Sequence, residues 1–260
     1  MTKSLGRVFA TLSLLVPAVL CAAPARAQMS EVKEKAPMYS YVSDWAIPRP
    51  QWAEMEKSNA ADQPILAKAM AAGTLIGYGD DSMLVHQPDA PTHDDWWSSM
   101  SLAGLMNVLD QFYKAGNAVS PVLSSATRHS DSIFVSRYYN WHSGSVKGAY
   151  THVAEYKFKA DAPDDALGLV SKNFIVPMME KLLADGTLQE YEIDTEAIHT
   201  ESPNSFWLVY IAANAEGLDK VNAALEATLK ASPFAGPAFG SMVDFSVHRD
   251  LLLRTNATFK

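Results

Sequence analysis

Two tyrosine–histidine pairs recur at the same spacing and have the side chains best suited to chemistry. Tyr78 stands eight residues before His86, and Tyr191 stands eight residues before His199. If each pair lies on a strand, the even spacing places its tyrosine and histidine on one face. Facing an internal pocket, the histidines could shuttle protons or serve as axial ligands, and the tyrosines could donate hydrogen bonds. The alternative is that the tyrosines belong to the core and each histidine ends a strand beside a hairpin turn.

Both pairs belong to a longer internal repeat. The stretch 64–86 aligns without gaps with 177–199, and the two share Pro, Lys, Ala, Gly, Thr, Leu, Tyr, Asp and His. The proline stands inside a predicted helix, which it would bend, and Gly73 or Gly186 would end that helix in a left-handed conformation. We therefore interpret most of the repeat as architecture and assign a chemical role to its tyrosine and histidine.

Two arginines and two tryptophans complete the candidate pocket. Arg137 and Arg249 end strands predicted to match, on faces that also carry apolar residues, so each needs either a substrate carboxylate or a carboxylate of the chain. Trp97 and Trp207 occupy matching places on the third strand of each half. Such bulk is typical of a core, but one of two adjacent aromatic residues must face the other way, where a planar ligand could stack.

The loop that begins at His86 gathers potential metal ligands, namely His86, Asp89, His93, Asp94 and Asp95. Their spacing matches no established metal signature, so we predict a solvated acidic hairpin and no metal site. Glycine-rich phosphate loops, H-E-x-x-H, G-x-S-x-G and paired C-x-x-C are absent from the sequence. Catalysis by a serine elbow, a phosphate-binding loop or a thiolate is therefore excluded.

Residues 1–27 have the pattern of a signal peptide. Lys3 and Arg7 precede a short apolar stretch, and Ala-Arg-Ala at 25–27 offers a cleavage site. We expect export to the periplasm or the extracellular space. The one cysteine, Cys21, lies in this segment, so the mature chain would have no disulfide and no thiol chemistry.

The charge balance excludes two classes of partner. After removal of 1–27 the chain carries 18 Lys and Arg against 29 Asp and Glu. Nucleic acids and anionic membranes both require a basic face, so neither is an expected partner.

Apolar periodicity divides the mature chain into two halves with one order of elements, strand–helix–strand–strand–helix–strand. The first half (38–139) has predicted elements at 39–47, 50–72, 74–86, 96–101, 102–113 and 132–139. The second half (149–260) has them at 150–158, 162–186, 187–199, 206–213, 218–229 and 242–249. Residues 28–37 are predicted as a flexible lead-in, and 140–148 as the linker between halves.

Each βαββαβ half would form an antiparallel sheet with both helices on one face, which leaves the other face to be covered. The duplicated pattern resembles the ferredoxin-like (dimeric α+β-barrel) superfamily, which includes antibiotic-biosynthesis monooxygenases, haem-degrading monooxygenases, muconolactone isomerases and chlorite dismutases. The resemblance implies an α+β fold in which two βαββαβ ferredoxin-like units pack sheet to sheet as a barrel. Because one chain carries both units, no oligomer is needed to close it.

The signal peptide and the expected barrel together predict a secreted protein that binds a small apolar or aromatic molecule between its sheets. The resemblance implies that it acts as a cofactor-light monooxygenase or an isomerase. The expected pocket residues are Tyr78, His86, Tyr191, His199, Arg137, Arg249, Trp97 and Trp207. One alternative is a non-catalytic extracytoplasmic structural or interaction protein with a filled barrel. Another is a haem protein with a strand histidine as ligand, as in the chlorite-dismutase and peroxidase branches. The sequence leaves enzymatic activity and the cofactor open.

Overall fold

A computed structural model describes residues 32–88, 90–200, 203–231 and 235–260. The predicted signal peptide (1–27) and residues 28–31 of the lead-in lie outside the described residues, as does Asp89 of the acidic loop. Residues 32–260 form one compact unit.

The first half has the predicted element order. Its elements are β1 (Met38–Ala46), α1 (Trp52–Ala71), β2 (Gly77–Met83), β3 (His93–Ser99), α2 (Leu102–Ala115) and β4 (Arg128–Trp141). The hydroxyl of Ser101 caps α2 by accepting a hydrogen bond from the backbone N–H of Gly104, and Gly116, with φ of 80°, ends it. These two local signals determine where α2 begins and ends between β3 and β4.

The second half repeats that order, but its first helix is divided into α3 and α4, and an additional helix, α6, follows α5. Its elements are β6 (Tyr150–Lys157), α3 (Ala166–Val170), α4 (Val176–Ala184), β7 (Leu188–Glu196), β8 (Ser205–Ala212), α5 (Ala215–Ala231), α6 (Ala235–Met242) and β9 (Arg249–Phe259). A π-helical turn at 171–175 joins α3 to α4 immediately before Pro177, whose missing N–H disturbs regular helix pairing. Gly73 and Gly186 have φ of 70° and 77°, which confirms the predicted left-handed ends of the repeated helices.

The predicted last strand of the second half, 242–249, is wrong. Met242 ends α6, a short 3₁₀ turn follows at Phe245–Val247, and the strand is β9, which starts at Arg249. The alternating side chains of 242–249 imitate a strand, whereas polar residues in the middle of β9 hide its apolar alternation from sequence reasoning.

The predicted linker 140–148 contains paired strand residues. β4 continues to Trp141, and β5 (Ser145–Val146) pairs with β9. Residues of the lead-in also contact β4, since the Tyr139 hydroxyl donates to the carbonyl of Ala36 over 2.9 Å.

The eight longer strands of the described chain close into one antiparallel barrel. Within the halves the strand orders are β4-β1-β3-β2 and β9-β6-β8-β7. β4 then pairs with β7, and β9 pairs with β2, so the fourth strand of each half joins the second strand of the other. This topology confirms the predicted fold class, two βαββαβ units packed as an α+β barrel.

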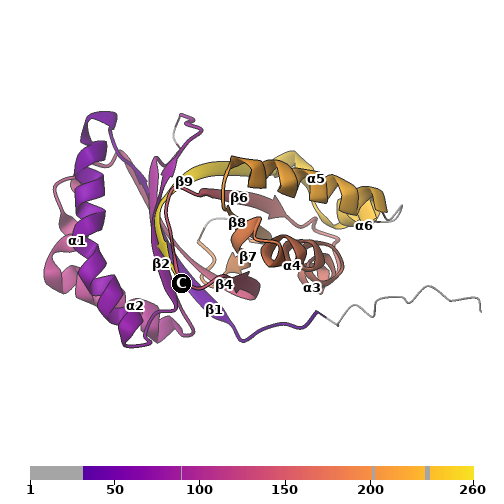
Figure 1. Ribbon diagram of the computed structural model, residues 1–260, viewed down its shortest axis with the longest axis horizontal. Coiled ribbons are helices and arrows are strands. Elements are labelled where there is room, and N and C mark those ends of the chain that lie inside the picture. The colour runs from indigo at the N-terminus through magenta and orange to yellow at the C-terminus, as the bar shows by residue number, and fades with distance from the viewer. Residues whose placement is uncertain (1–31, 89, 201–202, 232–234) are drawn as a thin grey trace, which may run out of the picture. The chain divides into compact units, whose positions relative to one another are not determined.

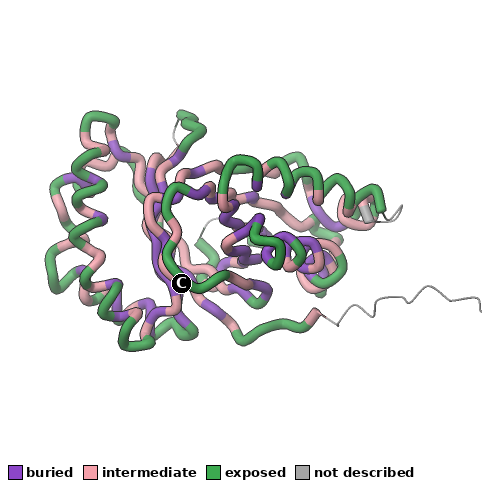
Figure 2. Tube along the Cα trace, in the orientation of Figure 1, coloured by how far each residue is buried: buried purple, intermediate pink, exposed green. Residues whose placement is uncertain are grey.

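The helices cover the outside of the barrel. Figure 1 shows α1 and α2 on the outer face of the first sheet, and α3 to α6 on the outer face of the second. Apolar clusters fill both layers, with Leu105 and Phe112 in the first and Met179 and Phe206 in the second. Figure 2 shows buried residues concentrated along the strands and on the inward sides of the helices. Strand alternation leaves the opposite face of each strand for the barrel interior.

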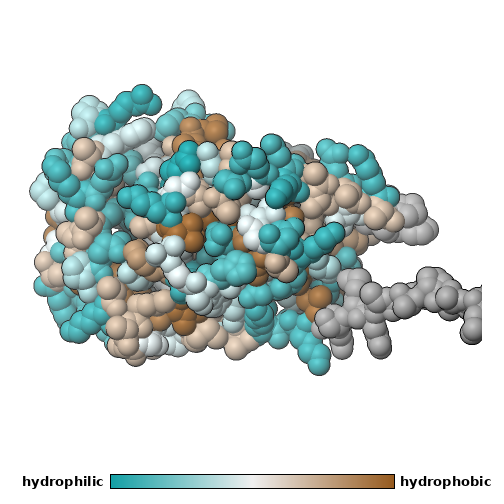
Figure 3. All heavy atoms as spheres, viewed as in Figure 1, coloured by the Kyte–Doolittle hydropathy of each residue, from teal (hydrophilic) through white to brown (hydrophobic). Residues whose placement is uncertain are grey.

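The surface is mixed in character. On the face seen in Figure 3, hydrophilic residues predominate and smaller apolar areas lie between them. Among the described residues, no helix combines the length and apolar character needed to cross a membrane.

Candidate functional site: a carboxyl-rich barrel lumen

A cavity, called here the lumen cavity, lies between the two sheets inside the barrel. Its volume is about 150 Å³, similar to that of an engineered protein cavity that accepts benzene. Its apolar wall consists of Val42, Trp96, Phe134, Val153, Trp207, Val209, Ile211 and Leu251. Its polar wall consists of Ser40, Asp44, Asp81, Asp94, Thr151, Glu190, Glu192 and Asp194. The cavity therefore combines apolar and aromatic surfaces with a high local density of carboxyl groups.

Two of these carboxyl groups, Asp81 and Asp194, are related by the internal repeat. They stand 113 residues apart, as the repeated tyrosines do, and come from β2 and β7 on opposite sides of the barrel. Each follows its tyrosine by three residues, and this odd spacing turns it to the other face of the strand. Asp81 is fully buried and Asp194 is 4 % exposed.

A strand irregularity accompanies each repeated aspartate. The pairing of β2 with β9 shifts between Asp80 and Asp81, and the pairing of β4 with β7 shifts next to Asp194. The unpaired extra residues are Asn256 on β9 and Arg137 on β4. Such bulges redirect side chains and are enriched beside active sites. They also show that Arg137 matches Asn256, so the predicted match of Arg137 with Arg249 is wrong.

Hydrogen bonds surround the carboxyl group of Asp81. Thr151 Oγ1 donates to its Oδ1 over 2.7 Å, and Trp96 Nε1 donates to its Oδ2 over 3.3 Å. Burial raises the pKa of Asp81 to about 6, although these hydrogen bonds oppose the rise. Asp81 therefore changes its charge close to neutral pH.

Asp194 has a different environment. The hydroxyl of Ser136 donates to its Oδ1. Burial, followed by the charge of Glu192, raises the pKa of Asp194 well above its usual value. The pKa of both repeated aspartates is thus raised by burial, and the two carboxyl groups face one cavity, where each could accept or donate a proton.

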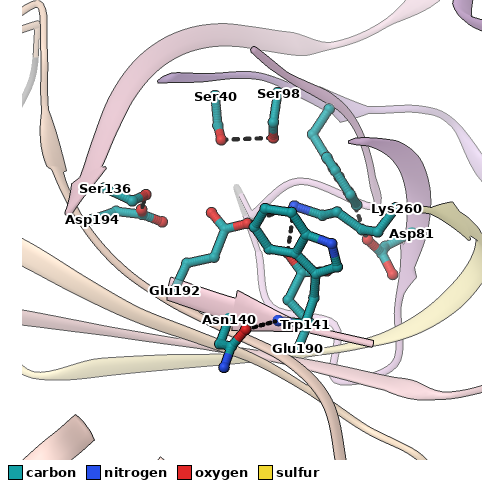
Figure 4. A network of polar contacts seen from close by, with 11 residues as sticks. Ser40, Asp81, Ser98, Ser136, Asn140, Trp141, Glu190, Glu192, Asp194 and Lys260 are labelled. Atoms are coloured by element: carbon teal, nitrogen blue, oxygen red, sulfur yellow. Dashed lines mark hydrogen bonds and ion pairs between the residues drawn. The ribbon is translucent and has the colours of Figure 1, made fainter. Parts of the chain in front are cut away.

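A buried lysine neutralises the acidic residues on one side of the lumen (Figure 4). Lys260 Nζ lies 2.5 Å from Glu190 Oε1 and 2.8 Å from Glu192 Oε1, and its side chain is 2 % exposed. The same Nζ lies 4.9 Å from the ring centroids of Trp96 and Trp141. The ammonium group is thus held by two carboxyl groups and two indole faces.

The two glutamates have opposite pKa shifts. Burial raises the pKa of Glu190 well above its usual value. For Glu192, the charge of Lys260 and hydrogen bonds outweigh burial and lower the pKa. We infer that Glu192 is the carboxylate of the pair and that Glu190 keeps its proton.

Asp94 has no such neutralisation. It lies opposite Asp81 on the neighbouring strand β3 and is 8 % exposed, and its Oδ1 has no hydrogen-bond partner. Burial and the charges of Asp81 and Asp44 raise its pKa well above the usual value. Among the described residues, no Lys, Arg or His forms an ion pair with Asp94 or Asp81.

The repeated tyrosines face the helices rather than the lumen. Tyr78 stacks on Phe259 with ring centroids 4.7 Å apart. The hydroxyl of Tyr191 donates to Glu180 Oε1 on α4 over 2.5 Å. Both rings are buried in the layers between sheet and helices, as in the alternative that assigned them to the core.

The predicted histidines and arginines also lie outside the lumen cavity. His86 and His199 are exposed and follow the ends of β2 and β7, where the chain turns into hairpins. Arg137 is exposed at the bulge of β4, and Arg249 is exposed and 3.9 Å from Glu155 Oε2. The strands end before either histidine, so the eight-residue spacing does not place them in the barrel.

Of the predicted tryptophans, Trp207 lines the lumen cavity and Trp97 does not. Trp97 packs in the helix-side core, and its neighbour Trp96 faces the lumen. Tyr78 pairs with Trp97 across the strands, and the repeated Tyr191 pairs with Tyr210. Trp97 therefore corresponds to Tyr210 and not to Trp207. The sequence alignment of the two third strands is therefore wrong, and its odd offset exchanges the two faces.

The predicted solvated hairpin is wrong for its second part. His93 and Asp94 belong to β3 and are buried. Burial, with a smaller contribution from His86, lowers the pKa of His93 to about 4, so it is neutral. Within the described residues, no group of three or more His, Cys, Asp or Glu is arranged to hold a metal ion.

A second cavity of about 220 Å³, called here the outer cavity, lies between the second sheet and its helices. In its wall, Asp250 lies between two histidines, 3.6 Å from His152 Nε2 and 3.1 Å from His248 Nε2. His152 Nδ1 is buried without a partner, and the ring stacks on Tyr210.

Neither cavity has the volume to hold haem in this structure. Both volumes are below the range of roughly 300–1,000 Å³ typical of sites for drug-sized ligands, and haem is larger than such ligands. No histidine is among the residues that line the lumen cavity in the described chain. We derive no reaction step through haem.

The sequence matches no protein-family model and no curated protein. In structure it is similar to a "putative monooxygenase" from Lactobacillus acidophilus NCFM, with a TM-score of 0.64, 11% identity, and coverage of 87% of this chain and 97% of that one. It is also similar to a "putative monooxygenase" from Fusobacterium nucleatum, with a TM-score of 0.64, 9% identity, and coverage of 87% of this chain and 95% of that one. A mutant chlorite dismutase from Candidatus Nitrospira defluvii is similar with a TM-score of 0.54, 12% identity, and coverage of 86% of this chain and 93% of that one. These similarities show the fold, which is the ferredoxin-like α+β barrel.

Sequence reasoning missed the lumen carboxyl groups, although the repeat contained a signal for two of them. The aspartate shared by 64–86 and 177–199 is Asp81 in one half and Asp194 in the other. This aspartate follows the repeated tyrosine by three residues, and an odd spacing along a strand places it on the face opposite to the helix-side core. Asp94 was noted only as part of the acidic loop, and no comparable pattern marks Glu190 or Lys260.

Proposed function

We propose that this chain is an exported enzyme that binds a small apolar or aromatic molecule in the lumen cavity and moves a proton on it. Isomerases and cofactor-light monooxygenases both begin in this way. The observation that carries the proposal is the pair Asp81 and Asp194, which face one cavity from opposite strands and whose pKa values are both raised by burial. The "putative monooxygenase" neighbours support it through the fold, which does not by itself fix a reaction.

The two aspartates would have distinct roles. Protonated Asp194 would donate a hydrogen bond to a carbonyl or hydroxyl oxygen of the substrate, and ionised Asp81 would accept a proton from the neighbouring carbon. An isomerase would return that proton to a different atom. In a monooxygenase the carbanion would reduce O₂, and oxidation of a CH₂ group to a carbonyl would place one oxygen atom in the product and release the other as water.

The walls would position the rest of the substrate. Trp96 and Trp207 offer indole surfaces, and Phe134 packs edge-on against Trp207 with centroids 4.9 Å apart. A ring of about six atoms suits both this surface and the cavity volume.

Binding can be tested with cyclohexanone, which joins an apolar ring to a carbonyl. We expect the indole N–H signals of Trp96 and Trp207 to shift and saturate in an NMR titration. Val209→Trp should fill the cavity and abolish the shifts, whereas Val119→Trp, at a position 67 % exposed, should not. Shifts that fail to saturate, or that survive Val209→Trp, would contradict binding in the lumen.

Catalysis can be tested by solvent-deuterium exchange at the α-carbons of cyclohexanone. The wild-type protein should accelerate exchange, and Asp81→Asn or Asp194→Asn should slow it about 100-fold, the lower range for loss of a general acid or base. Asp110→Asn, on the exposed side of α2, is the matched control. Binding without acceleration would support the alternative of a non-catalytic binding protein.

Haem is a second candidate, and two observations favour testing it. A chlorite dismutase shares the fold, and His152 Nδ1 is buried without a partner beside the outer cavity. The cavity would have to widen to admit the group. A Soret band that appears on adding haem and is lost in His152→Ala would support this function, and an unchanged haem spectrum would exclude it.

A further inference from the structure

The lumen already contains one alkylammonium group, and its surroundings show how this barrel holds such a cation. Lys260 Nζ contacts one oxygen of Glu190 and one of Glu192, and lies over the ring of Trp96 on β3. Carboxylate contacts and aromatic faces are the two kinds of surface that stabilise an ammonium group away from water.

The wall formed by β2 and β3 offers the same kinds of group, carboxyl groups and indole rings, but no lysine is paired with these carboxyl groups among the described residues. Asp94 and Asp81 are cross-strand neighbours that both line the lumen cavity, and Trp96 Nε1 donates to Asp81. Trp207 contributes a second indole to the wall. Asp94 lines the cavity and is 8 % exposed, and its Oδ1 is buried without a hydrogen-bond partner. A buried carboxyl oxygen without a partner costs stability, and a bound donor would remove that cost.

We propose that the molecule bound in the lumen cavity carries a protonated amino group, which Asp94 holds beside the indoles of Trp96 and Trp207. This inference rests on the proposed function, because it names the chemical class of the ligand in the same cavity. Asp94 has no role in the proton transfer assigned to Asp81 and Asp194. It binds and orients the ligand, with the apolar part of the ligand against Val209 and Ile211 of β8.

An organic ammonium fits this wall better than an inorganic cation does. A metal ion needs several oxygen or nitrogen ligands directed at one point, and no such group of His, Cys, Asp or Glu occurs in the described residues. Most of the remaining wall is aliphatic or aromatic and could not coordinate an ion, but it matches the carbon skeleton of an amine.

The ligand charge should make binding depend on pH. The titratable and charged groups around Asp94 are Asp44, Asp80, Asp81 and Asp95 on the first sheet, Glu190, Glu192 and Asp194 on β7, and Lys260 after β9. An ammonium group stabilises ionised Asp94, so binding releases a proton wherever Asp94 is protonated in the free protein. Alkylamines keep their own proton up to a pH of about 10. Affinity should therefore rise with pH through the neutral range.

Three ligands with one ring test the inference. Cyclohexylamine, cyclohexanol and cyclohexanecarboxylate share the six-membered ring and differ in charge. At pH 7.5 we expect cyclohexylamine to bind about tenfold more tightly than cyclohexanol, as charge-assisted hydrogen bonding predicts, and the carboxylate to bind most weakly. Asp94→Asn should remove the preference for the amine, so that cyclohexylamine binds no more tightly than cyclohexanol. Asp110→Asn should preserve the preference.

A measurement on the wild-type chain covers the case in which Asp94→Asn does not fold. The dissociation constant of cyclohexylamine should fall between pH 5.5 and pH 8, and that of cyclohexanol should stay constant. Equal affinities for the two ligands, a preference that persists in Asp94→Asn, or competition by CaCl₂ or KCl would each overturn the inference. If cyclohexanol binds and cyclohexylamine binds no more tightly, the inference about the amino group fails but the proposed function is retained. If neither ligand binds, the proposed function fails as well.

Discussion

The two sides of the lumen hold similar carboxyl groups in different ways. On β7, Glu190 and Glu192 surround the ammonium group of Lys260, which is itself buried. On β2 and β3, Asp81 and Asp94 lie side by side, and among the described residues no basic side chain forms an ion pair with either. Each side has a buried carboxyl oxygen without a hydrogen-bond partner, Glu190 Oε2 on β7 and Asp94 Oδ1 on β3, but a cation is paired with the carboxyl groups on the β7 side alone among the described residues.

This difference separates a structural role from a binding role. A buried charge that is paired within the chain contributes to one folded state, and removing one partner leaves an uncompensated charge. A buried carboxyl group without a cation lowers stability and is typical of functional sites, where the missing partner is the ligand. The four following experiments test whether the two sides differ in this way.

The largest effect is expected from removing the cation of the β7 side. Lys260→Met should lower the free energy of unfolding by about 3–5 kcal/mol, because Glu192 would remain as a buried unpaired carboxylate. Urea denaturation would measure it. Adding Glu192→Gln should restore part of the loss.

Lys230→Met is the matched control for that substitution. Lys230 pairs with Glu226 on exposed α5, with side chains 76 % and 70 % exposed, and should change stability by less than about 0.5 kcal/mol. A loss below about 1 kcal/mol for Lys260→Met would contradict a structural role for the β7 ion pair.

The β2–β3 side should show its uncompensated charge as a dependence on pH. An unfolded aspartate loses its proton near pH 4, but folded Asp81 loses it near pH 6. Between these values the folded state binds more protons, so the free energy of unfolding falls as pH rises. The raised pKa of Asp94 adds to this fall.

Asp94→Asn should therefore flatten the pH profile and stabilise the protein at pH 7.5 by about 1–3 kcal/mol, with little change at pH 4. Urea denaturation at a series of pH values would measure it. A variant less stable than wild type at pH 7.5 would show that the Asp94 carboxylate is already compensated in the free protein.

The outer faces of the same two strands allow a smaller test. Tyr191 lies on the helix-facing side of β7, and its hydroxyl donates a hydrogen bond to Glu180. Tyr78 lies on the helix-facing side of β2, and no hydrogen bond joins its hydroxyl to another described residue. Tyr191→Phe should cost about 1–2 kcal/mol, and Tyr78→Phe less than about 0.5 kcal/mol. Equal costs in thermal or urea denaturation would show that the repeated tyrosines are equivalent despite their different partners.

The smallest effect is expected at the repeated histidines. His86→Phe and His199→Phe alter exposed positions beyond the strand ends, so the affinity for cyclohexanol should change by less than about twofold, or roughly 0.4 kcal/mol. An NMR titration of each variant would measure it. A larger loss would indicate that the hairpins close over the lumen.

Local signals in the sequence predicted most of the architecture. The element order follows from apolar periodicity, and Gly73 and Gly186 end their helices because glycine adopts the left-handed conformation without strain. The last strand was missed because polar residues such as Arg254 and Asn256 interrupt its pattern, and barrel closure through β2 and β9 involves partners far apart in the chain.

The candidate site was far less accessible to sequence reasoning. The repeat marked Tyr78 and Asp81 equally in the first half, and only the odd spacing separated them. Sequence alignment also exchanged the roles of Trp96 and Trp97, since it was displaced by three residues and any odd displacement reverses the face of a strand. Tyr78 and Trp97, which belong to the helix-side core, were therefore assigned to the pocket.

The sequence by itself determined the elements, their duplication and the two alternating faces of every strand, because these depend on neighbouring residues. Tertiary structure alone decided which face became the barrel interior, since that depends on where the helices pack and on which distant strands pair. It also brought Lys260 between Glu190 and Glu192 and left Asp94 without a counter-charge. The difference in burial between these positions, and the pKa shifts that follow, arise from contacts between residues far apart in the chain.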